Sequence, residues 1–344
     1  MEGNIEDPNA VMQQLGGTTV IGKCIAENVE ITPSVFASFI RQDASSSVTF
    51  GLTSFDSPYK ESFLSSIKEE LSSQGISTRY IVNKKSEPLS AVVVKGQHVQ
   101  EYLVIKTETG NLFVKTVAVQ NIPEWAKRDF DRPYADPKRG MLPPKVARML
   151  VNIVGSFRET DETATLLDPF CGMGTVLAEA QLMGWNVIGS DIAPDVVSNT
   201  IGNLEWLKQE YPSITSIFRV VQSDAVHVSK HVDPVSVCAI VTEPFMGSPS
   251  FALQDKVDPE EIRNTIKGLE KLYIGCLKDW HGILRSNGVI LMALPRFRLK
   301  GREFFVKKVI DSCEMLGYSI SEGPLVYGRP NATVERNFYL FQKR

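Results

Sequence analysis

Two different patterns of apolar and polar residues divide the chain. Up to about residue 120, short segments rich in Val, Ile, Thr and aromatic residues predict strands at residues 19–29, 47–55, 78–83, 89–96, 102–108 and 112–119. Between them, residues 58–75 carry Phe63, Ile67 and Leu71 at helical spacing and predict a helix that ends at Gly75. These strands with one clear helix predict an α+β module.

The rest of the chain alternates strands with helices. Residues 121–145 are crowded with prolines and with charges of both signs, which is typical of a junction between domains. A helix is predicted at residues 144–157, and apolar strand-like runs follow at residues 165–170, 186–192, 218–224, 237–243 and 288–294, separated by helical segments. This order predicts parallel βαβ units in a doubly wound α/β sheet. Residues 318–328 and 337–343 predict an antiparallel C-terminal strand pair. We expect one domain at residues 1–122 and a second, with its linker, at residues 123–344.

Composition narrows the class of protein. The hydrophobic content of 43% and the charged content of 22% are typical of a soluble globular protein, and a net charge of −3 argues against coating nucleic acid by bulk charge. The five cysteines are scattered and the four histidines do not cluster, so we expect no metal site, no disulfide framework and a cytoplasmic location. The acidic first residues differ from a signal peptide, and no apolar run is long enough to cross a membrane. None of these features indicates the oligomeric state.

Candidate binding residues follow the predicted parallel strands. Ligands of open α/β sheets bind beyond the carboxyl ends of the strands. Four successive strands deliver a carboxylate there, namely Asp168, Asp191, Asp224 and Glu243. Any one of them could merely cap the helix that follows. All four in register, beside a loop with Gly172 and Gly174, favour a ligand site instead.

The glycine loop discriminates between classes of ligand. Position 177 is Leu, so the spacing departs from the G-x-G-x-x-G of nicotinamide-binding proteins, and the Gly-Lys-Ser/Thr of a phosphate loop is absent. An acid that precedes the glycines, here Asp168, would repel a pyrophosphate. It suits a cofactor with a cationic amino-acid end, such as S-adenosylmethionine, and Asp191 would then accept hydrogen bonds from the ribose hydroxyls.

The segments LLDPFCGMGTVLAEA and GWNVIGSDI resemble the cofactor-binding region of class I S-adenosylmethionine-dependent methyltransferases, closest to the group that methylates exocyclic amines of nucleobases. The resemblance implies a Rossmann-like fold for the second domain. It also implies cofactor contacts by Asp168, Pro169, Phe170, Gly172, Gly174, Thr175, Asp191, Ile192, Asp224 and Ala225.

Glu243, Pro244 and Phe245 stand where that group has Asp/Asn-Pro-Pro-Tyr/Phe. An exocyclic amine is a poor nucleophile because its lone pair is delocalised into the ring. The Glu243 carboxylate and the Pro244 carbonyl could accept both N–H bonds and direct the lone pair toward the methyl donor. Phe245 could stack on a base drawn out of its helix. We therefore expect these three residues to be catalytic, although Glu is one methylene longer than Asp and the ring stands one place early.

The resemblance extends to enzymes that act on tRNA. The segment RDFDRPYADPKRGMLPPKVARMLVNI is similar to the one before the catalytic domain of THUMP-containing tRNA guanine-N2 methyltransferases, and LVYGRPNATVERNFYLFQK is similar to their C-terminal end. Residues 1–122 resemble a THUMP-like RNA-binding domain, with LGGTTVIGKC near its start and few residues before it, so that this domain looks shortened. The resemblance implies tRNA as the partner and N2 of a guanosine as the target.

Basic residues are the candidate RNA contacts. Phosphate contacts could come from Lys138, Arg139, Arg296, Arg298, Lys300 and Arg302, and Phe297 offers a stacking face. A solvated loop and helix start explains the same residues equally well. The motif around Glu243 also fits a DNA methyltransferase acting on adenine N6 or cytosine N4, and the Glu-for-Asp change fits an inactive tRNA-binding protein that retains the fold.

Overall fold

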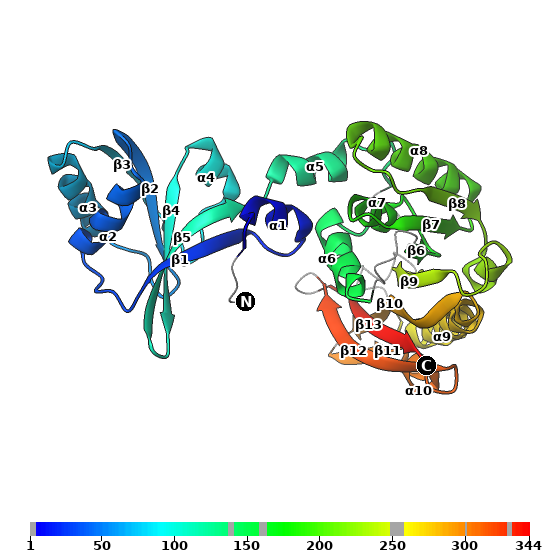
Figure 1. The fold of residues 1–344 in the computed structure, drawn as a ribbon. Helices are drawn as coiled ribbons and strands as arrows, with labels where there is room; N and C mark the ends of the chain where they lie inside the picture. Colours follow the sequence, from blue (N-terminus) through cyan, green and yellow to red (C-terminus); the bar gives the residue numbers. More distant parts are fainter. Residues whose placement is uncertain (1–4, 137–140, 158–163, 248–257, 300, 329–331) are drawn as a thin grey trace. The chain divides into compact units, whose positions relative to one another are not determined.

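The computed structural model describes residues 5–136, 141–157, 164–247, 258–299, 301–328 and 332–344. The chain divides into two compact units, Met1–Trp125 and Ala126–Arg344, each with its own sheet (Figure 1). Helix α5 (Ile122–Phe130) includes the boundary, within the segment that the sequence marks as a junction. In the part of the chain that the structure describes, no helix is long and apolar enough to span a membrane.

The N-terminal unit is a five-stranded mixed sheet with the order β1-β5-β4-β2-β3. Strand β2 runs parallel to β3 and β4, and the remaining pairs are antiparallel. Helices α2 and α3 lie on one side of the sheet and α4 on the other (Figure 1). The elements are α1 (Pro8–Gln14), β1 (Val20–Glu27), α2 (Pro33–Asp43), β2 (Ser47–Ser54), α3 (Glu61–Ser73), β3 (Ser77–Ile81), α4 (Ala91–Gly96), β4 (Gln100–Thr107) and β5 (Gly110–Val119).

Two local predictions in this unit are wrong. The strand predicted at residues 89–96 is instead helix α4 from Ala91 to Gly96, which Ser90 caps: its hydroxyl accepts from the Val93 amide at 3.4 Å, and the first turn buries Ala91. Local capping here outweighs the β-propensity of the valine run. Helix α2 was not predicted at all; Thr32 caps it, and its buried residues include Phe36 and Ile40.

The C-terminal unit confirms the predicted doubly wound sheet. Its strand order is β12-β13-β10-β9-β6-β7-β8, with β6 to β10 parallel and β13 antiparallel between β10 and β12. The order reverses between β6 and β9, which is the position where such sheets bind ligands. The elements are α6 (Pro144–Gly155), β6 (Thr165–Asp168), α7 (Thr175–Leu182), β7 (Asn186–Asp191), α8 (Pro194–Glu210), β8 (Phe218–Gln222), the 3₁₀ helix η2 (Ala225–Lys230), β9 (Val237–Thr242), α9 (Pro259–His281), β10 (Leu284–Leu299), β11 (Arg302–Phe305), α10 (Lys307–Ser312), β12 (Tyr318–Tyr327) and β13 (Val334–Lys343).

Apolar side chains cover both faces of this sheet. One cluster packs α6, α7 and α8 against the sheet, and a second packs η2, α9 and α10 against the opposite face. Strand β9 is buried at every position, as expected for a central parallel strand covered on both sides. The two layers hold the strand ends rigidly at the ligand-binding edge.

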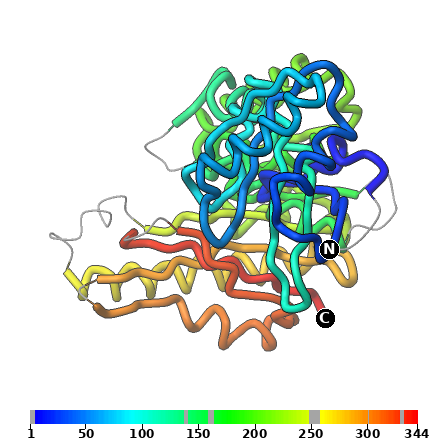
Figure 2. The backbone as a smooth tube through the Cα atoms, turned by 90° about the vertical axis from the view of Figure 1, so that its left-hand side faces the viewer, coloured from blue at the N-terminus to red at the C-terminus, as the bar shows by residue number. Residues whose placement is uncertain are grey.

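Strand β10 is longer than predicted. It pairs with β13 from Val289 to Phe297 (Figure 2) and continues to Leu299, where a turn at Gly301 (φ +74°) returns the chain as β11. The alternative of a solvated loop and helix start after the fifth strand therefore does not hold for the described residues of this segment. Pairing with both β13 and β11 carries this strand past the end of β9.

Candidate active site

The carboxyl ends of the parallel strands β6, β7, β8 and β9 bring the four predicted acids to one edge of the sheet. The buried Asp168 accepts, through Oδ1, from the Thr242 hydroxyl at 2.7 Å and from the Phe170 amide at 3.1 Å. This joins the ends of β6 and β9 at the point where the strand order reverses. The charges of Asp191 and Glu243 act on Asp168 from either side.

Burial dominates the protonation of Asp168. The pKa of this carboxyl is raised to about 7 from its ordinary 3.8, chiefly by burial; the hydrogen bonds from Thr242 and Phe170 oppose this rise, and the charges of Asp191 and Glu243 add to it. Its charged form is costly in the ligand-free site, because a buried carboxylate without a cation loses its hydration. A cation at this position would favour the ionised form. This agrees with the cationic amino-acid end expected from the sequence.

The glycine loop has the backbone that only glycine adopts readily. Gly172 and Gly174 have φ of +48° and +81°, and Gly174 directly precedes α7. A Cβ at Gly174 would lie 2.8 Å from the Thr200 Cγ2 atom. The Thr200 hydroxyl in turn donates to the Gly172 carbonyl. The loop is therefore held against α8 by close backbone approach.

Side chains from α8 and from the junction segment also hold the glycine loop. The Asn203 Nδ2 atom donates to the carbonyls of Met173 and Tyr134, both at 3.0 Å, and the Thr175 hydroxyl accepts from Arg132 at 2.8 Å. Sequence reasoning did not assign Thr200 or Arg132 to the site. The only sequence signal was their place in the helix after β7 and in the junction.

Asp191 ends β7 and closes the other side of the loop. Its Oδ2 accepts from the Gly172 amide at 3.3 Å and its Oδ1 from the Ala193 amide at 3.0 Å. Beside it, Ile192 is 67% exposed, which leaves an apolar side chain at the surface of the site. Asp224 is exposed after β8, where it accepts from the Val226 amide and caps η2.

The remaining predicted cofactor residues face the interior. Phe170 packs edge-on against Trp280, with ring centroids 6.4 Å apart, and the carbonyl of the buried Ala225 accepts from the Trp280 indole at 2.9 Å. The Pro169 carbonyl accepts from the Ser190 hydroxyl at 3.3 Å. Through these side chains and carbonyls, the three residues tie the site to the core.

The expected catalytic segment follows β9 directly. Pro244 is buried, whereas Phe245 is 58% exposed and its carbonyl accepts from the Tyr273 hydroxyl of α9 at 2.7 Å. Glu243 is mostly buried, and its Oε1 accepts from Arg336 Nε at 2.6 Å. Burial raises the pKa of Glu243, and the Arg336 charge and hydrogen bond lower it. Arg336 was missed from the sequence, where it is one arginine in a β-rich C-terminal segment.

Only some of the candidate RNA-contact residues belong to the part of the chain that the structure describes. Lys138, Arg139 and Lys300 lie outside the described residues. Arg298 pairs with Glu303 at 3.1 Å and with Glu335 at 2.7 Å, and Arg296 pairs with Glu303 at 3.6 Å. Arg302 is exposed on β11. Phe297 is wholly buried in the core, so the expectation of a stacking face there is wrong.

A cluster of buried charged side chains surrounds helix α7, which follows the glycine loop. Glu179 on α7 is 1% exposed and accepts from Arg128 at 2.8 Å through one oxygen and from Arg148 at 2.6 Å through the other. This paired cluster fixes helix α7, which follows Gly174 directly. Among the described residues, no group of three or more His, Cys, Asp or Glu side chains could hold a metal ion.

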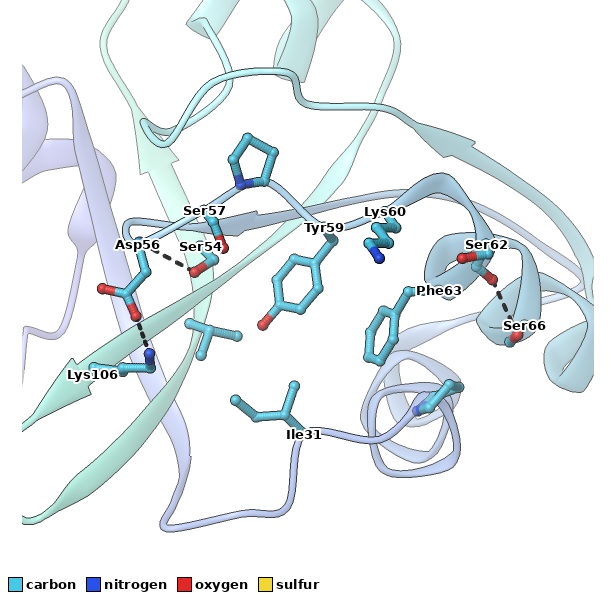
Figure 3. A pocket seen from close by; sticks show the side chains of 13 residues that line it. Ile31, Ser54, Asp56, Ser57, Tyr59, Lys60, Ser62, Phe63, Ser66 and Lys106 are labelled. Atoms are coloured by element: carbon cyan, nitrogen blue, oxygen red, sulfur yellow. Dashed lines mark hydrogen bonds and ion pairs between the residues drawn. The ribbon is translucent and has the colours of Figure 1, made fainter.

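A separate hollow of about 580 Å³ lies within the N-terminal unit. Tyr59 and Phe63 stack there with ring centroids 5.0 Å apart, and the side chains of Lys60 and Lys106 line the same space (Figure 3). Lys106 is paired with Asp56. Burial, followed by the charge of Asp56, raises the pKa of Tyr59 to about 12, so its hydroxyl is neutral at physiological pH.

Comparison with known proteins gives one domain family and a set of similar relatives. A family model described as "RMKL-like, methyltransferase domain" matches residues 132–244. A "Probable tRNA (guanine(10)-N2)-dimethyltransferase" of Methanothermococcus thermolithotrophicus is 37% identical over 44% of this chain and 84% of its own length. The tRNA (guanine(10)-N2)-dimethyltransferase of Methanothermobacter thermautotrophicus is 37% identical over 49% of this chain and 43% of its own. The enzyme of that name from Methanocaldococcus jannaschii is 31% identical over 53% and 47%. The chain thus spans less than half the length of the last two.

Proposed function

Because the chain belongs to the family of the tRNA (guanine(10)-N2)-dimethyltransferases, we propose that it transfers a methyl group from S-adenosylmethionine to the exocyclic N2 amine of a guanosine in tRNA. One observation carries the proposal. A partly exposed aromatic and a mostly buried carboxylate, Phe245 and Glu243, follow the strand next to the Asp168–Gly174 loop. A nucleobase and a nucleoside cofactor can therefore meet at one edge of the sheet.

The residues present fit the cofactor. Asp191 would hold the ribose hydroxyls, and Asp224 would face the adenine. The exposed Ile192, next to Asp191 in the chain, would offer an apolar contact to the adenine. Gly172 and Gly174 let the backbone approach the amino-acid end, and the Asp168 carboxyl provides the negative charge there. S-adenosylmethionine supplies an electrophilic methyl group when bound.

Glu243 and Pro244 would act on the target amine. Their carboxylate and carbonyl oxygens accept the two N–H bonds, which localises the nitrogen lone pair toward the methyl donor. The lone pair would form the new N–C bond as the bond between the sulfonium sulfur of S-adenosylmethionine and its methyl group breaks, leaving S-adenosylhomocysteine, and one amine proton would then be lost to an acceptor such as water. Phe245 is exposed and would stack on the extruded guanine. The contribution of the protein is mainly positioning and electrostatics.

RNA binding is the second part of the proposal. We assign the N-terminal unit to a THUMP-like RNA-binding domain, as the sequence resemblance implies. Its hollow offers the stacked Tyr59 and Phe63 together with Lys60, a combination suited to bases and phosphates of single-stranded RNA (Figure 3). In the C-terminal unit, the exposed Arg302 is a candidate phosphate contact. A tRNA substrate also supports a cytoplasmic location.

The test is methyl transfer from labelled S-adenosylmethionine to unmodified tRNA transcripts, with duplex DNA in parallel and nucleoside analysis of the product. N2-methylguanosine or its dimethyl form in tRNA, lost in Glu243→Ala, is the expected result. Label in DNA alone would replace the proposal with a DNA amino-methyltransferase. A folded protein that binds cofactor without any transfer would indicate an inactive RNA-binding member of the family.

A further inference from the structure

Arg336 occupies an unusual place for an arginine. It lies on β13, an inner strand of the sheet, opposite Pro295 of β10 and Tyr327 of β12. Side chains two and four positions further along a strand point to the same face. Those residues, Phe338 and Leu340, are buried in the apolar cluster beneath α6 and α7. A charged side chain at the edge of such a cluster is stable only with a partner.

The partner of Arg336 is the expected catalytic carboxylate. Arg336 Nε donates to Glu243 Oε1 at 2.6 Å, and the Arg336 and Glu243 side chains are 23% and 15% exposed. The guanidinium also lies 5.8 Å from the centroid of the Tyr327 ring. Among the described residues, none donates to Glu243 Oε2. Arg336 of β13 thus fixes one carboxylate oxygen of Glu243, and no described residue occupies the other.

This geometry explains how a glutamate can serve where related motifs carry the shorter Asp or Asn. The additional methylene gives the carboxylate more rotamers and a longer reach, so its position must be set by an outside contact. An arginine provides that contact because its planar guanidinium donates in fixed directions. A lysine ammonium would supply the charge without the same direction.

We propose that Arg336 is a positioning residue that holds Glu243 by Oε1 and presents Oε2 to the amine being methylated. This role rests on the proposed function. Arg336 itself does not contact the reacting atoms, so its loss should lower turnover more than it weakens binding of the RNA. The arginine on β13 and the glutamate after β9 then work as one unit.

Electrostatics give the proposal a second, independent consequence. Among the residues that the structure describes, the charged and titratable groups that interact with Glu243 are Arg336 from β13, Asp168 from β6 and Tyr273 from α9. Of these, Arg336 lowers the pKa of Glu243 against the effect of burial. Removing its charge should raise this pKa, so that the active, ionised carboxylate is reached only at higher pH.

The experiment measures kcat and KM for tRNA against pH in the wild type, Arg336→Gln and Arg336→Lys. Arg344→Gln is the matched control, because Arg344 forms an ion pair with Glu314 at 2.9 Å whose side chains are 53% and 73% exposed. For Arg336→Gln we expect the acidic limb of kcat to move up by about one pH unit or more and kcat at pH 7 to fall about tenfold. For Arg336→Lys we expect the acidic limb of the kcat–pH profile to shift little, but the maximal kcat reached at higher pH, the plateau of the profile, to be lower than in the wild type. KM for tRNA should stay within about twofold in both, and the control should match the wild type.

The outcomes separate the two proposals. If the wild type methylates no RNA, the proposed function fails and the role of Arg336 fails with it. If the wild type is active and both variants keep the wild-type plateau and acidic limb, only the positioning role is overturned. If Arg336→Gln does not fold, the kcat plateau of a folded Arg336→Lys variant tests the positioning role. A lowered plateau with unchanged melting temperature supports the role, and an unchanged plateau refutes it.

Discussion

Asp168 offers a test of how the site is built, because its carboxyl is buried and yet expected to meet a cation. The change is Asp168→Asn, which keeps an oxygen to accept from the Thr242 hydroxyl and the Phe170 amide but cannot ionise. If burial raises the pKa as the structure indicates, the asparagine should be the more stable residue at neutral pH in the absence of ligand.

The size and sign of the effect follow from the pKa. The folded value of about 7 lies above the ordinary 3.8, so between these values the native protein holds a proton that the unfolded chain has lost. Wild-type stability therefore falls, relative to Asp168→Asn, as pH rises through this window. The slope is about 1.4 kcal/mol per pH unit, which sums to roughly 4 kcal/mol over about three units. Below the window the two proteins should differ little, and above it the difference should stay constant.

Urea unfolding from about pH 4 to 8, followed by fluorescence of the buried Trp185 and Trp280 in the C-terminal unit, measures this difference. Asp233→Asn, at an exposed aspartate, is the control for loss of a negative charge. A difference between wild type and Asp168→Asn that does not change with pH would refute the reasoning. Calorimetry with S-adenosylhomocysteine completes the test, because its ammonium group should bind the wild type more tightly than the asparagine variant.

Three further changes test other parts of the site. Gly174→Ala should destabilise the protein by about 1–3 kcal/mol and weaken cofactor binding, because Gly174 has a positive φ and a Cβ there would approach Thr200. Thermal denaturation measures the loss, with Gly155→Ala as the control because a Cβ at Gly155 would meet nothing within 4 Å. Glu179→Ala should cost about 3–5 kcal/mol in urea unfolding, since it leaves two buried arginines without their carboxylate. Phe245→Ala should raise KM for tRNA about tenfold without changing the melting temperature, because the ring is 58% exposed and would stack on a base.

The architecture of the C-terminal unit could be predicted because periodicity is a local property. Apolar runs of strand length followed by helical segments specify parallel strands, and parallel strands place their carboxyl ends at one edge. This is why Asp168, Asp191, Asp224 and Glu243 could be predicted to lie at one edge of the sheet from the order of the strands. The same logic is weaker for short elements, where one cap decides. Ser90 caps helix α4, which contains the run of valines that predicted a strand, and Thr32 caps helix α2, which the residue pattern did not predict.

The partners of the site residues could not be predicted, because they come from distant parts of the chain. The glycine loop is held by Thr200 and Asn203 of α8 and by Arg132 of the junction. Glu243 meets an arginine 93 residues later. Nothing in a local window distinguishes these residues from ordinary polar positions on helices and strands. Only the sheet order, with β13 inserted next to β10, brings Arg336 to the site.

The same long-range pairing changes how the basic segment at residues 295–302 is interpreted. In the sequence, residues 295–302 include Arg296 and Arg298 and contain no acid, which suggests a free positive patch. In the folded chain, β11 and β13 place Glu303 and Glu335 against them. The pairs with Glu303, whose side chain is 53% exposed, contribute little stability, so a phosphate could displace this carboxylate at small cost. RNA binding through this hairpin would then depend on competition with its own glutamates. Glu303→Gln should accordingly tighten tRNA binding at low salt, and unchanged or weaker binding would exclude the hairpin as a phosphate contact.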